Sequence, residues 1–351
     1  MDNTYVDAST EITPKISVIV PVFNRREFLM KAMVSLKEQT LNKLLYEVVV
    51  IKNFYDDYLD LKISEFGFIN LFSDGTMGDR LASAISQSKG TIICFLQDDD
   101  IFFAEKLELI FNKFSENNEI GFISNGFEQI DQWGNLIKTR NKIIKRESFF
   151  SNLDKRDLIT ISFMIKNGWD FNLSCMSVKK SIIEPYLSDL RQIEGADDSF
   201  VFFISLFQEG SLYRIEKPIT KYRLHNSATN KFGKIDVMLM KNYSTFKRQV
   251  KTFKLLYNLA PNKIFKEIIK SGIMEREIVI EIVSPHKIKI GSTYSKIKWL
   301  VNHNHTSNMK FIIKLIFETI ISTISKKIGK YSYYTYMKLK FSENNNNGTG
   351  N

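Results

Sequence analysis

The chain carries three successive aspartates, Asp98, Asp99 and Asp100, directly after the apolar run at residues 91–96. A short run of apolar and β-branched residues without a helical period is typical of a buried strand. Adjacent carboxylates repel one another, and a hard divalent cation such as Mg²⁺ or Mn²⁺ removes that repulsion because it prefers oxygen ligands. The triplet therefore predicts a cation site. The alternative is a solvated acidic turn in which Asp100 caps the following helix.

Alternating strands and helices are expected to position this motif. The residue patterns predict strands at 15–20, 47–51, 70–73, 91–96 and 120–124, helices at 27–39, 78–88 and 105–114, and a hairpin turn at 131–135. Such alternation is typical of parallel βαβ units, which bind ligands at the carboxyl ends of their strands. We therefore expect three polar segments to meet at one edge of the sheet, namely residues 22–25, 52–53 and 97–100.

Two segments resemble the opening half of the family 2 glycosyltransferases of GT-A fold. They are residues 15–25, KISVIVPVFNR, and residues 90–100, GTIICFLQDDD. In that family the first segment lines the nucleotide, and the acidic cluster is the DxD motif that holds a metal on the diphosphate of a sugar nucleotide. The resemblance implies an α/β protein with a Rossmann-like, mainly parallel GT-A sheet and a nucleotide-diphosphate sugar as donor.

Two later segments extend the resemblance to about residue 230. Residues 195–202, GADDSFVF, are similar to the family's ED signature, in which the second acid is the general base, and Asp198 takes that place. Asp197 is the rival base, and helix capping is the structural alternative for Asp198. Residues 219–227, ITKYRLHNS, look like the family's YRxHxxS segment, whose arginine and histidine lie near the diphosphate.

The resemblance assigns a role to each candidate residue. Asp198 is the expected catalytic base, and with no enzyme nucleophile in view, direct displacement with inversion at the sugar carbon follows. The expected ligands of a Mn²⁺ or Mg²⁺ cofactor are Asp99, Asp100 and His225. The residues expected to bind the nucleotide sugar are Pro21, Phe23, Arg25, Asn53, Arg80, Asp98 and Arg223. A plain surface position is the alternative for Arg80, a surface ion pair for Arg223, and a structural role for His225.

Two positions depart from the family's pattern. The acid that usually follows the second strand and accepts a hydrogen bond from the nucleotide base is missing, because Lys52 and Asn53 follow Ile51. Gln97 replaces the usual first acid of the DxD motif, although the metal-binding acid of the pattern falls on Asp99. The identity of the nucleotide base is therefore left open.

The charge of the chain is unevenly distributed. Residues 1–230 carry 27 Lys and Arg against 32 Asp and Glu, whereas residues 231–351 carry 22 against 7. We expect a GT-A catalytic domain at 1–230, a basic helical C-terminal region at 231–341 and a disordered polar tail at 342–351. The basic region predicts an anionic partner, with a plain solvated basic surface as the alternative.

Residues 309–328 place isoleucines at helical spacing beside lysines, which predicts an amphipathic basic helix. It either packs on the catalytic domain or lies on an anionic membrane, near a saccharide or lipid-linked acceptor. No secretory signal opens the chain and no apolar run reaches the roughly 18 residues of a membrane span, so we expect a cytoplasmic protein, peripheral on the cytoplasmic face of the membrane in the second case.

Two other functions compete with this interpretation. A nucleotidyltransferase is disfavoured because no Gly-rich, basic phosphate loop follows the first predicted strand. A basic nucleic-acid-binding protein is favoured only by the charge of the C-terminal region, which contains no recognised nucleic-acid motif, so no nucleic-acid partner is expected. Cys94 and Cys175 are too few and too far apart in the chain for a disulfide framework.

Overall fold

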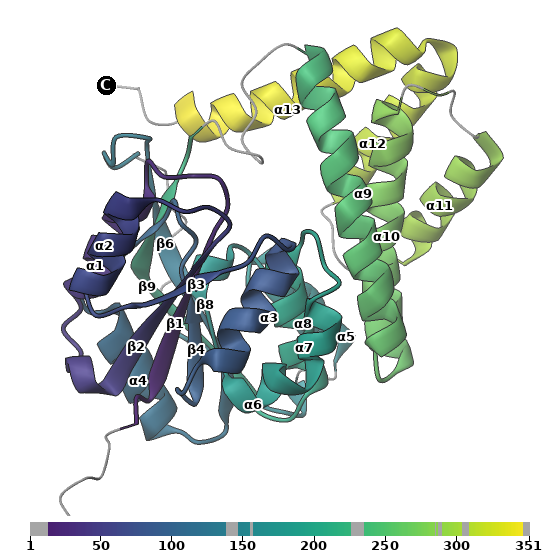
Figure 1. The fold of residues 1–351 in the computed structure, drawn as a ribbon. Coiled ribbons are helices and arrows are strands. Elements are labelled where there is room, and N and C mark those ends of the chain that lie inside the picture. The colour runs from purple at the N-terminus through teal and green to yellow at the C-terminus, as the bar shows by residue number, and fades with distance from the viewer. Residues whose placement is uncertain are drawn as a thin grey trace, which may run out of the picture.

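The computed structural model describes residues 13–137, 147–154, 157–225, 235–284, 286, 290–303 and 309–346. One twisted sheet has helices on both faces, and a group of longer helices follows it in the chain (Figure 1).

The strands are β1 (Ile16–Val22), β2 (Tyr46–Lys52), β3 (Ile69–Phe72), β4 (Ile92–Phe95), β5 (Ile101–Phe102), β6 (Ile120–Ile130), β7 (Ser148–Phe150), β8 (Met176–Lys179) and β9 (Ser211–Arg223). The helices are α1 (Leu29–Lys37), α2 (Asp57–Glu65), α3 (Met77–Gln87), α4 (Lys106–Glu116), α5 (Leu158–Lys166), α6 (Lys180–Ile183), α7 (Leu187–Leu190), α8 (Asp197–Phe207), α9 (Ile235–Leu259), α10 (Lys263–Val283), α11 (Ile290–Asn302), α12 (Met309–Ile324) and α13 (Lys326–Asn346).

The sheet has the strand order β3-β2-β1-β4-β8-β6-β9-β5, with β7 also paired to β9. Strands β3, β2, β1 and β4 are parallel to one another, β8 runs antiparallel between β4 and β6, and β6 and β9 are parallel. The predicted α/β architecture is confirmed. As expected, the carboxyl ends of β1, β2 and β4 meet at one edge.

The elements predicted from the sequence differ from the observed ones mainly after residue 120. Strand β6 continues to Ile130, and the predicted turn follows it, with Asp131 Oδ1 accepting hydrogen bonds from the backbone of residues 133–135 at 2.9 Å. The segment 138–156, predicted only as a connection, contains β7, while residues 138–146 and 155–156 lie outside the described residues. The sequence patterns also missed α2, whose first turn is capped by the Asp56 side chain.

The apolar core on one face of the sheet continues into the C-terminal helices. Residues of α3 and α8 pack there together with Phe253 of α9 and Phe265 of α10. Phe253 lies 6.1 Å from Phe203 between ring centroids, and Phe265 lies 5.0 Å from Phe207. The predicted boundary between residues 230 and 231 falls outside the described residues, and the regions on its two sides share this core.

A further apolar cluster lies within the C-terminal helices, where Ile282 of α10, Leu300 of α11, Ile312 of α12 and Tyr333 of α13 are buried together. Helix α13 continues to Asn346, so helix replaces the first residues of the expected polar tail, because each residue added to an existing helix gains a backbone hydrogen bond. Residues 347–351 lie outside the described part of the chain. None of the described helices is long and apolar enough to cross a membrane.

Helix α3 approaches the backbone after α7 so closely that only glycine fits at position 78. A Cβ at Gly78 would collide with the backbone oxygen of Leu190 and with Ile193. We predict that Gly78→Ala lowers the free energy of unfolding by about 1–3 kcal/mol, because overpacking forces the two segments apart. Gly291→Ala in α11 is the matched control, since nothing lies within 4 Å of its Cβ position. Equal denaturant midpoints for the two variants would contradict the prediction.

Candidate active site

A guanidinium and two carboxylates form the centre of the site. Arg25, in the loop after β1, places Nη2 2.5 Å from Asp98 Oδ1 and Nη1 2.5 Å from Asp99 Oδ2. Burial alone would lower the pKa of Arg25, but the two carboxylates hold that pKa above its ordinary value. The parallel pairing of β1 with β4 brings the two loops together, as predicted.

His225 completes this cluster from the end of β9. Its Nε2 lies 2.8 Å from Asp99 Oδ2 and 3.4 Å from Arg25 Nη1, and its ring meets the Phe28 ring edge-on at 4.7 Å. Burial would raise the pKa of Asp99, but the hydrogen bond from His225 and the charge of Arg25 hold it below its ordinary value. Asp99 is therefore an anion that two basic side chains already contact.

Asp100 points into the protein. Its Oδ2 accepts hydrogen bonds from Asn172 Nδ2 at 2.9 Å and Ser174 Oγ at 2.7 Å, and its Oδ1 accepts one from the backbone N–H of Arg223 at 3.0 Å. Burial, and then the neighbouring Asp99, raise the pKa of Asp100 to about 7. These contacts argue against the predicted ligand role of Asp100 and give it a bracing role.

Arg223 is also largely committed to the protein backbone. Its Nε donates to the Asp99 carbonyl at 2.8 Å, and its Nη1 donates to the carbonyls of Asp131 and Gln132 at 3.0 and 3.1 Å. The guanidinium carbon lies 4.7 Å from the centre of the Phe28 ring. Nη2 is buried and has no hydrogen-bond partner among the described residues. One donor of Arg223 therefore remains for a ligand.

Arg80 of α3 reaches the same site from the other side. Its Nη1 donates to the Gly75 carbonyl at 2.6 Å, and its guanidinium lies 4.7 Å from the centre of the Phe23 ring. Burial lowers the pKa of Arg80, and the charges of Asp98 and Asp197 oppose that shift. Its buried Nε has no hydrogen-bond partner in the described part of the chain. Arg80 therefore interacts electrostatically with Asp98 and Asp197 of the site, and also with Asp79 of its own helix.

The loop after β1 is fastened to the loop after β2. Asn53 Oδ1 accepts a hydrogen bond from Asn24 N, and Asn53 Nδ2 donates to Asn24 Oδ1, both at 2.9 Å. Asn24 has a positive φ of 53°, which asparagine tolerates better than most residues. Pro21 is buried in β1, and Asp98 Oδ2 accepts from the Phe23 N–H at 3.3 Å. Asn53 therefore positions the loop that carries Phe23 and Arg25.

The two candidate bases lie in the first turn of α8, each half-buried and in different electrostatic surroundings. Burial, and then the charge of Asp198, raise the pKa of Asp197 to about 7, while Arg80 opposes the shift. Burial also raises the pKa of Asp198, opposed by the Ser199 N–H at 2.8 Å and by Arg276. Asp197 Oδ2 has no hydrogen-bond partner among the described residues. Both carboxyls therefore suit proton abstraction.

Sequence reasoning missed two charged groups close to Asp198. Asp170, after α5, and Arg276, on α10, both interact with it electrostatically. Arg276 also donates to Gln249 Oε1 at 3.1 Å, and its guanidinium lies 3.9 Å from the centre of the Phe253 ring. No motif marks either residue, and the Lys-rich pattern around Arg276 showed only a helix. The C-terminal helices thus contribute a cation beside the predicted base.

In the described chain, no group of three or more His, Cys, Asp or Glu side chains is arranged to hold a metal ion. Asp99 and His225 nevertheless bring one carboxylate and one imidazole side by side, and both kinds of group occur as ligands of divalent cations.

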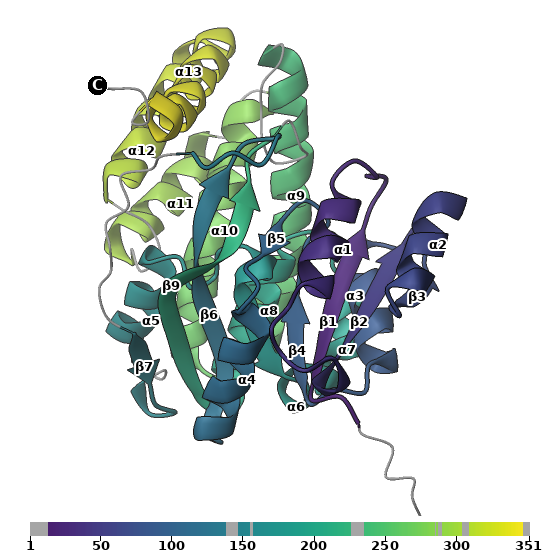
Figure 2. The ribbon, with the colours of Figure 1, turned by 90° about the vertical axis from the view of Figure 1, so that its left-hand side faces the viewer.

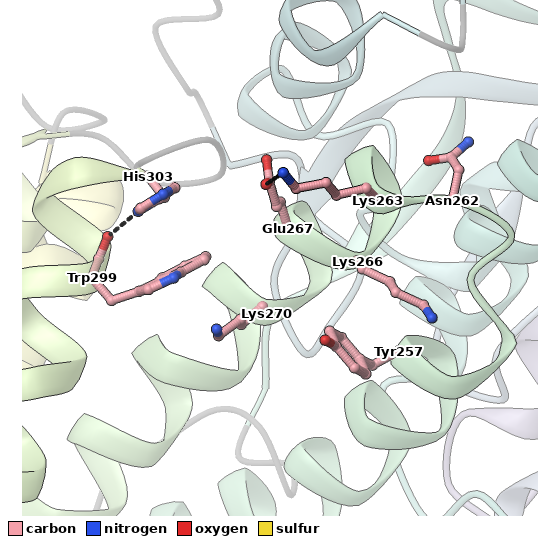
Figure 3. A pocket seen from close by; sticks show the side chains of 8 residues that line it. All are labelled: Tyr257, Asn262, Lys263, Lys266, Glu267, Lys270, Trp299 and His303. Atoms are coloured by element: carbon pink, nitrogen blue, oxygen red, sulfur yellow. Dashed lines mark hydrogen bonds and ion pairs between the residues drawn. The ribbon is translucent and has the colours of Figure 1, made fainter.

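A separate pocket of about 380 Å³ lies among α9, α10 and α11 (Figure 3). Lysines of α10 line it together with Trp299, whose ring stacks on His303 at 4.6 Å between centroids. None of the predicted site residues lines this pocket.

Comparisons with known proteins agree with the geometry. Residues 17–174 match glycosyl transferase family 2. The GalNAc(5)-diNAcBac-PP-undecaprenol beta-1,3-glucosyltransferase of Campylobacter jejuni is 28% identical over 224 residues, 60% of this chain and 65% of that protein. The Escherichia coli UDP-Glc:alpha-D-GlcNAc-diphosphoundecaprenol beta-1,3-glucosyltransferase WfgD is 24% identical over 232 residues, 63% of this chain and 82% of that protein.

Other relatives are much longer than the matched region. An uncharacterized glycosyltransferase of Rickettsia bellii is 32% identical over 133 residues, which are 36% of this chain and 19% of that protein. The chain therefore spans about a fifth of the Rickettsia protein and just under two thirds of the Campylobacter protein.

Among solved structures, S. aureus TarS 1–349 in complex with UDP-GlcNAc has a TM-score of 0.54 at 15% identity, covering 91% of this chain and 89% of that one. This likeness confirms the expected GT-A fold with a helical C-terminal region. Over residues 17–174, the chain is thus similar to glycosyl transferase family 2.

Proposed function

We propose that this protein transfers a sugar, with inversion at the sugar carbon, from a nucleotide-diphosphate sugar to a hydroxyl group of a lipid-linked saccharide. The observation that carries the proposal is the cluster of Arg25, Asp98, Asp99 and His225 at the carboxyl ends of β1, β4 and β9, in a chain similar to family 2. Open α/β sheets bind their ligands at that edge.

Cationic side chains at this edge suit the diphosphate of the donor. Arg25 lies at the surface of the cluster, and Arg80 and Arg223 each keep one buried nitrogen without a partner among the described residues. A diphosphate gains charge as it leaves, and preorganised donors stabilise that charge. The TarS complex with UDP-GlcNAc and the name of WfgD support a nucleotide-sugar donor.

A divalent cation is part of the proposal. Asp99 and His225 are the residues that would hold Mn²⁺ or Mg²⁺, while Asp100 braces the strands behind them. When bound, the cation would supply positive charge to the leaving diphosphate. Arg25 pairs with both Asp98 and Asp99, so its positive charge, together with that of the cation, would neutralise the carboxylates and the phosphates.

The names of two relatives support a lipid-linked acceptor. The Campylobacter and E. coli proteins are named for acceptors in which a saccharide is joined to undecaprenol through a diphosphate. An acceptor of that kind is held at a membrane surface. The expected cytoplasmic location with peripheral membrane contact is therefore part of the same proposal.

The acceptor hydroxyl must lose its proton as it attacks the sugar carbon. Asp198 is the proposed base, with Asp197 as its rival, and the raised pKa of each carboxyl makes it a stronger base than an exposed aspartate. Attack from the side opposite the diphosphate inverts the configuration at the sugar carbon.

The direct test is a transfer assay. The purified chain is incubated with Mn²⁺ or Mg²⁺, a panel of nucleotide sugars and undecaprenyl-diphosphate-linked N-acetylhexosamine, and the lipid product is analysed by mass spectrometry. The proposal expects one donor to add one hexose or N-acetylhexosamine with inverted configuration. A retained configuration would contradict the mechanism. Absence of transfer from every donor would contradict the proposal that the acceptor is a lipid-linked saccharide.

For the base, we predict that Asp198→Asn lowers the turnover number by roughly 10²- to 10⁴-fold, the usual contribution of general-base catalysis, and leaves donor affinity nearly unchanged. Steady-state kinetics of Asp198→Asn and Asp197→Asn decide between the two residues. A large turnover loss in Asp197→Asn alone would move the role to Asp197. In the wild type, turnover should rise with pH as the base loses its proton, with an inflection above the ordinary aspartate pKa.

For the cation, we predict that Asp99→Asn weakens metal-dependent donor binding by at least about 10-fold, because the substitution removes a charged ligand and about 1.4 kcal/mol corresponds to that factor. Thermal stabilisation by donor, measured with Mn²⁺ and with a chelator, gives the readout. Asp57→Asn, at an exposed position of α2, is the control. Donor binding to Asp99→Asn that still responds to Mn²⁺ as in the wild type would rule out Asp99 as a ligand.

A further inference from the structure

Helix α12 exposes an apolar stripe. The side chains of Ile313, Phe317, Ile320 and Ile324 are between 52% and 81% exposed. They are spaced by four, three and four residues, so they form one continuous stripe along the helix. Isolated apolar residues are common on protein surfaces, but a contiguous group of large ones marks a contact surface.

The opposite side of α12 is partly polar although it is buried. It carries the apolar Ile312 and Leu315, but Glu318 is 0% exposed and Thr319 and Ser322 are also buried. Glu318 pairs with Lys314 and accepts a hydrogen bond from Ser332 Oγ at 2.9 Å. A helix that packs on a protein core and faces water normally has its polar residues outside. In this part of α12 the arrangement is reversed.

The apolar surface continues onto α13, where Ile328 and Tyr331 are 59% and 60% exposed. Lys327 and Lys330 accompany it as the sequence neighbours of these two side chains, and residues 309–346 contain seven lysines against two glutamates, of which Lys314 is paired with Glu318 on the buried side. The surface formed by Ile313, Phe317, Ile320, Ile324, Ile328 and Tyr331 is called the apolar stripe below. It therefore combines apolar side chains with net positive charge.

The apolar stripe belongs to helices on the active-site side of the molecule. Figures 1 and 2 show α12 and α13 on the side toward which β6 and β9 run, and β9 ends at Arg223, close to His225. A surface that binds the apolar stripe would therefore lie on the same side of the molecule as the carboxyl edge of the sheet.

We infer that the apolar stripe binds the surface of an anionic lipid bilayer, with its isoleucines and Phe317 in the interfacial region and its lysines at the headgroups. Binding is peripheral, as no described helix is suited to span the bilayer. A second copy of the chain is the poorer occupant, because pairing two copies of the stripe would bring their lysines together, whereas anionic lipid neutralises them. The inference deepens the proposed function, since a lipid-linked acceptor resides in such a bilayer.

Sedimentation of the full chain with vesicles tests this inference. The vesicles contain phosphatidylcholine alone or with phosphatidylglycerol. The stripe variant is Ile313→Ser/Phe317→Ser/Ile320→Ser. The control variant is Leu44→Ser/Tyr58→Ser/Leu61→Ser, whose three positions on the catalytic domain are similarly exposed. Circular dichroism and thermal melting verify that both variants are folded.

The wild type and the control variant should bind the phosphatidylglycerol vesicles, and the stripe variant should bind at least about 10-fold more weakly. High salt should release the wild type only in part, because screening removes the contribution of the lysines and leaves that of the apolar side chains. Equal binding by both variants, or no binding by the wild type, would overturn the inference. So would a wild-type dimer that ignores vesicles and that the stripe variant converts to a monomer. The assay contains neither donor nor acceptor, so its failure and a failure of sugar transfer are separate results.

Discussion

The ion pairs of Arg25 with Asp98 and Asp99 are the constraint on which the rest of the site depends. Three acids in succession at the end of a buried strand repel one another, Arg25 offsets the charge of two of them, and a buried charge that loses its partner costs about 3–5 kcal/mol. The parallel register of β1 and β4, in which Ile19 lies opposite Phe95, brings that charge to the acids. Strand pairing and charge compensation therefore support each other.

Asp99 and Asp100, two successive residues of the acidic triplet, have different roles. Asp99 faces the site, where it contacts Arg25 and His225, whereas Asp100 points inward and accepts three hydrogen bonds, two from residues 172–174 and one from the end of β9. One of its donors is the backbone N–H of Arg223, two residues before His225. The inward acid thus fixes the end of β9, and the end of β9 places the histidine beside the outward acid.

The residues that sequence reasoning located correctly are those that follow strands of the parallel half of the sheet. Arg25 and Asp99 are examples, because a buried apolar run marks where each strand ends and topology fixes which ends meet. Site residues that come from other parts of the fold are not marked by an apolar run in the sequence. Arg223 was expected at the diphosphate, yet its Nη1 binds two carbonyls of the 131–135 turn and its Nε binds the Asp99 carbonyl, contacts that exist only in the folded chain. Strand β8 is four residues long and enters between β4 and β6, so neither its length nor its neighbours mark its place.

The same limit applies to the C-terminal helices. Helical periodicity identified a basic, apolar-faced region, but it does not say which surface such a helix covers. In the sequence, Arg276 cannot be told apart from an arginine on an exposed helix surface. Only the packing of its guanidinium on Phe253 brings it near Asp170 and Asp198. The exposed and buried sides of α12 likewise became distinguishable only when its neighbours were in place.

The core that the sheet shares with α9 and α10 cannot be completed until the ribosome has synthesised both helices. A ribosome releases β9 before α9 and α10, so the face of α8 that carries Phe203 and Phe207 stays uncovered until Phe253 and Phe265 emerge. At roughly 5–20 residues per second, the stretch from β9 to α10 takes about 2 to 10 seconds to synthesise. During that interval Phe203 and Phe207 lack their aromatic partners, so the core on this face of the sheet is complete only after α9 and α10 have been synthesised.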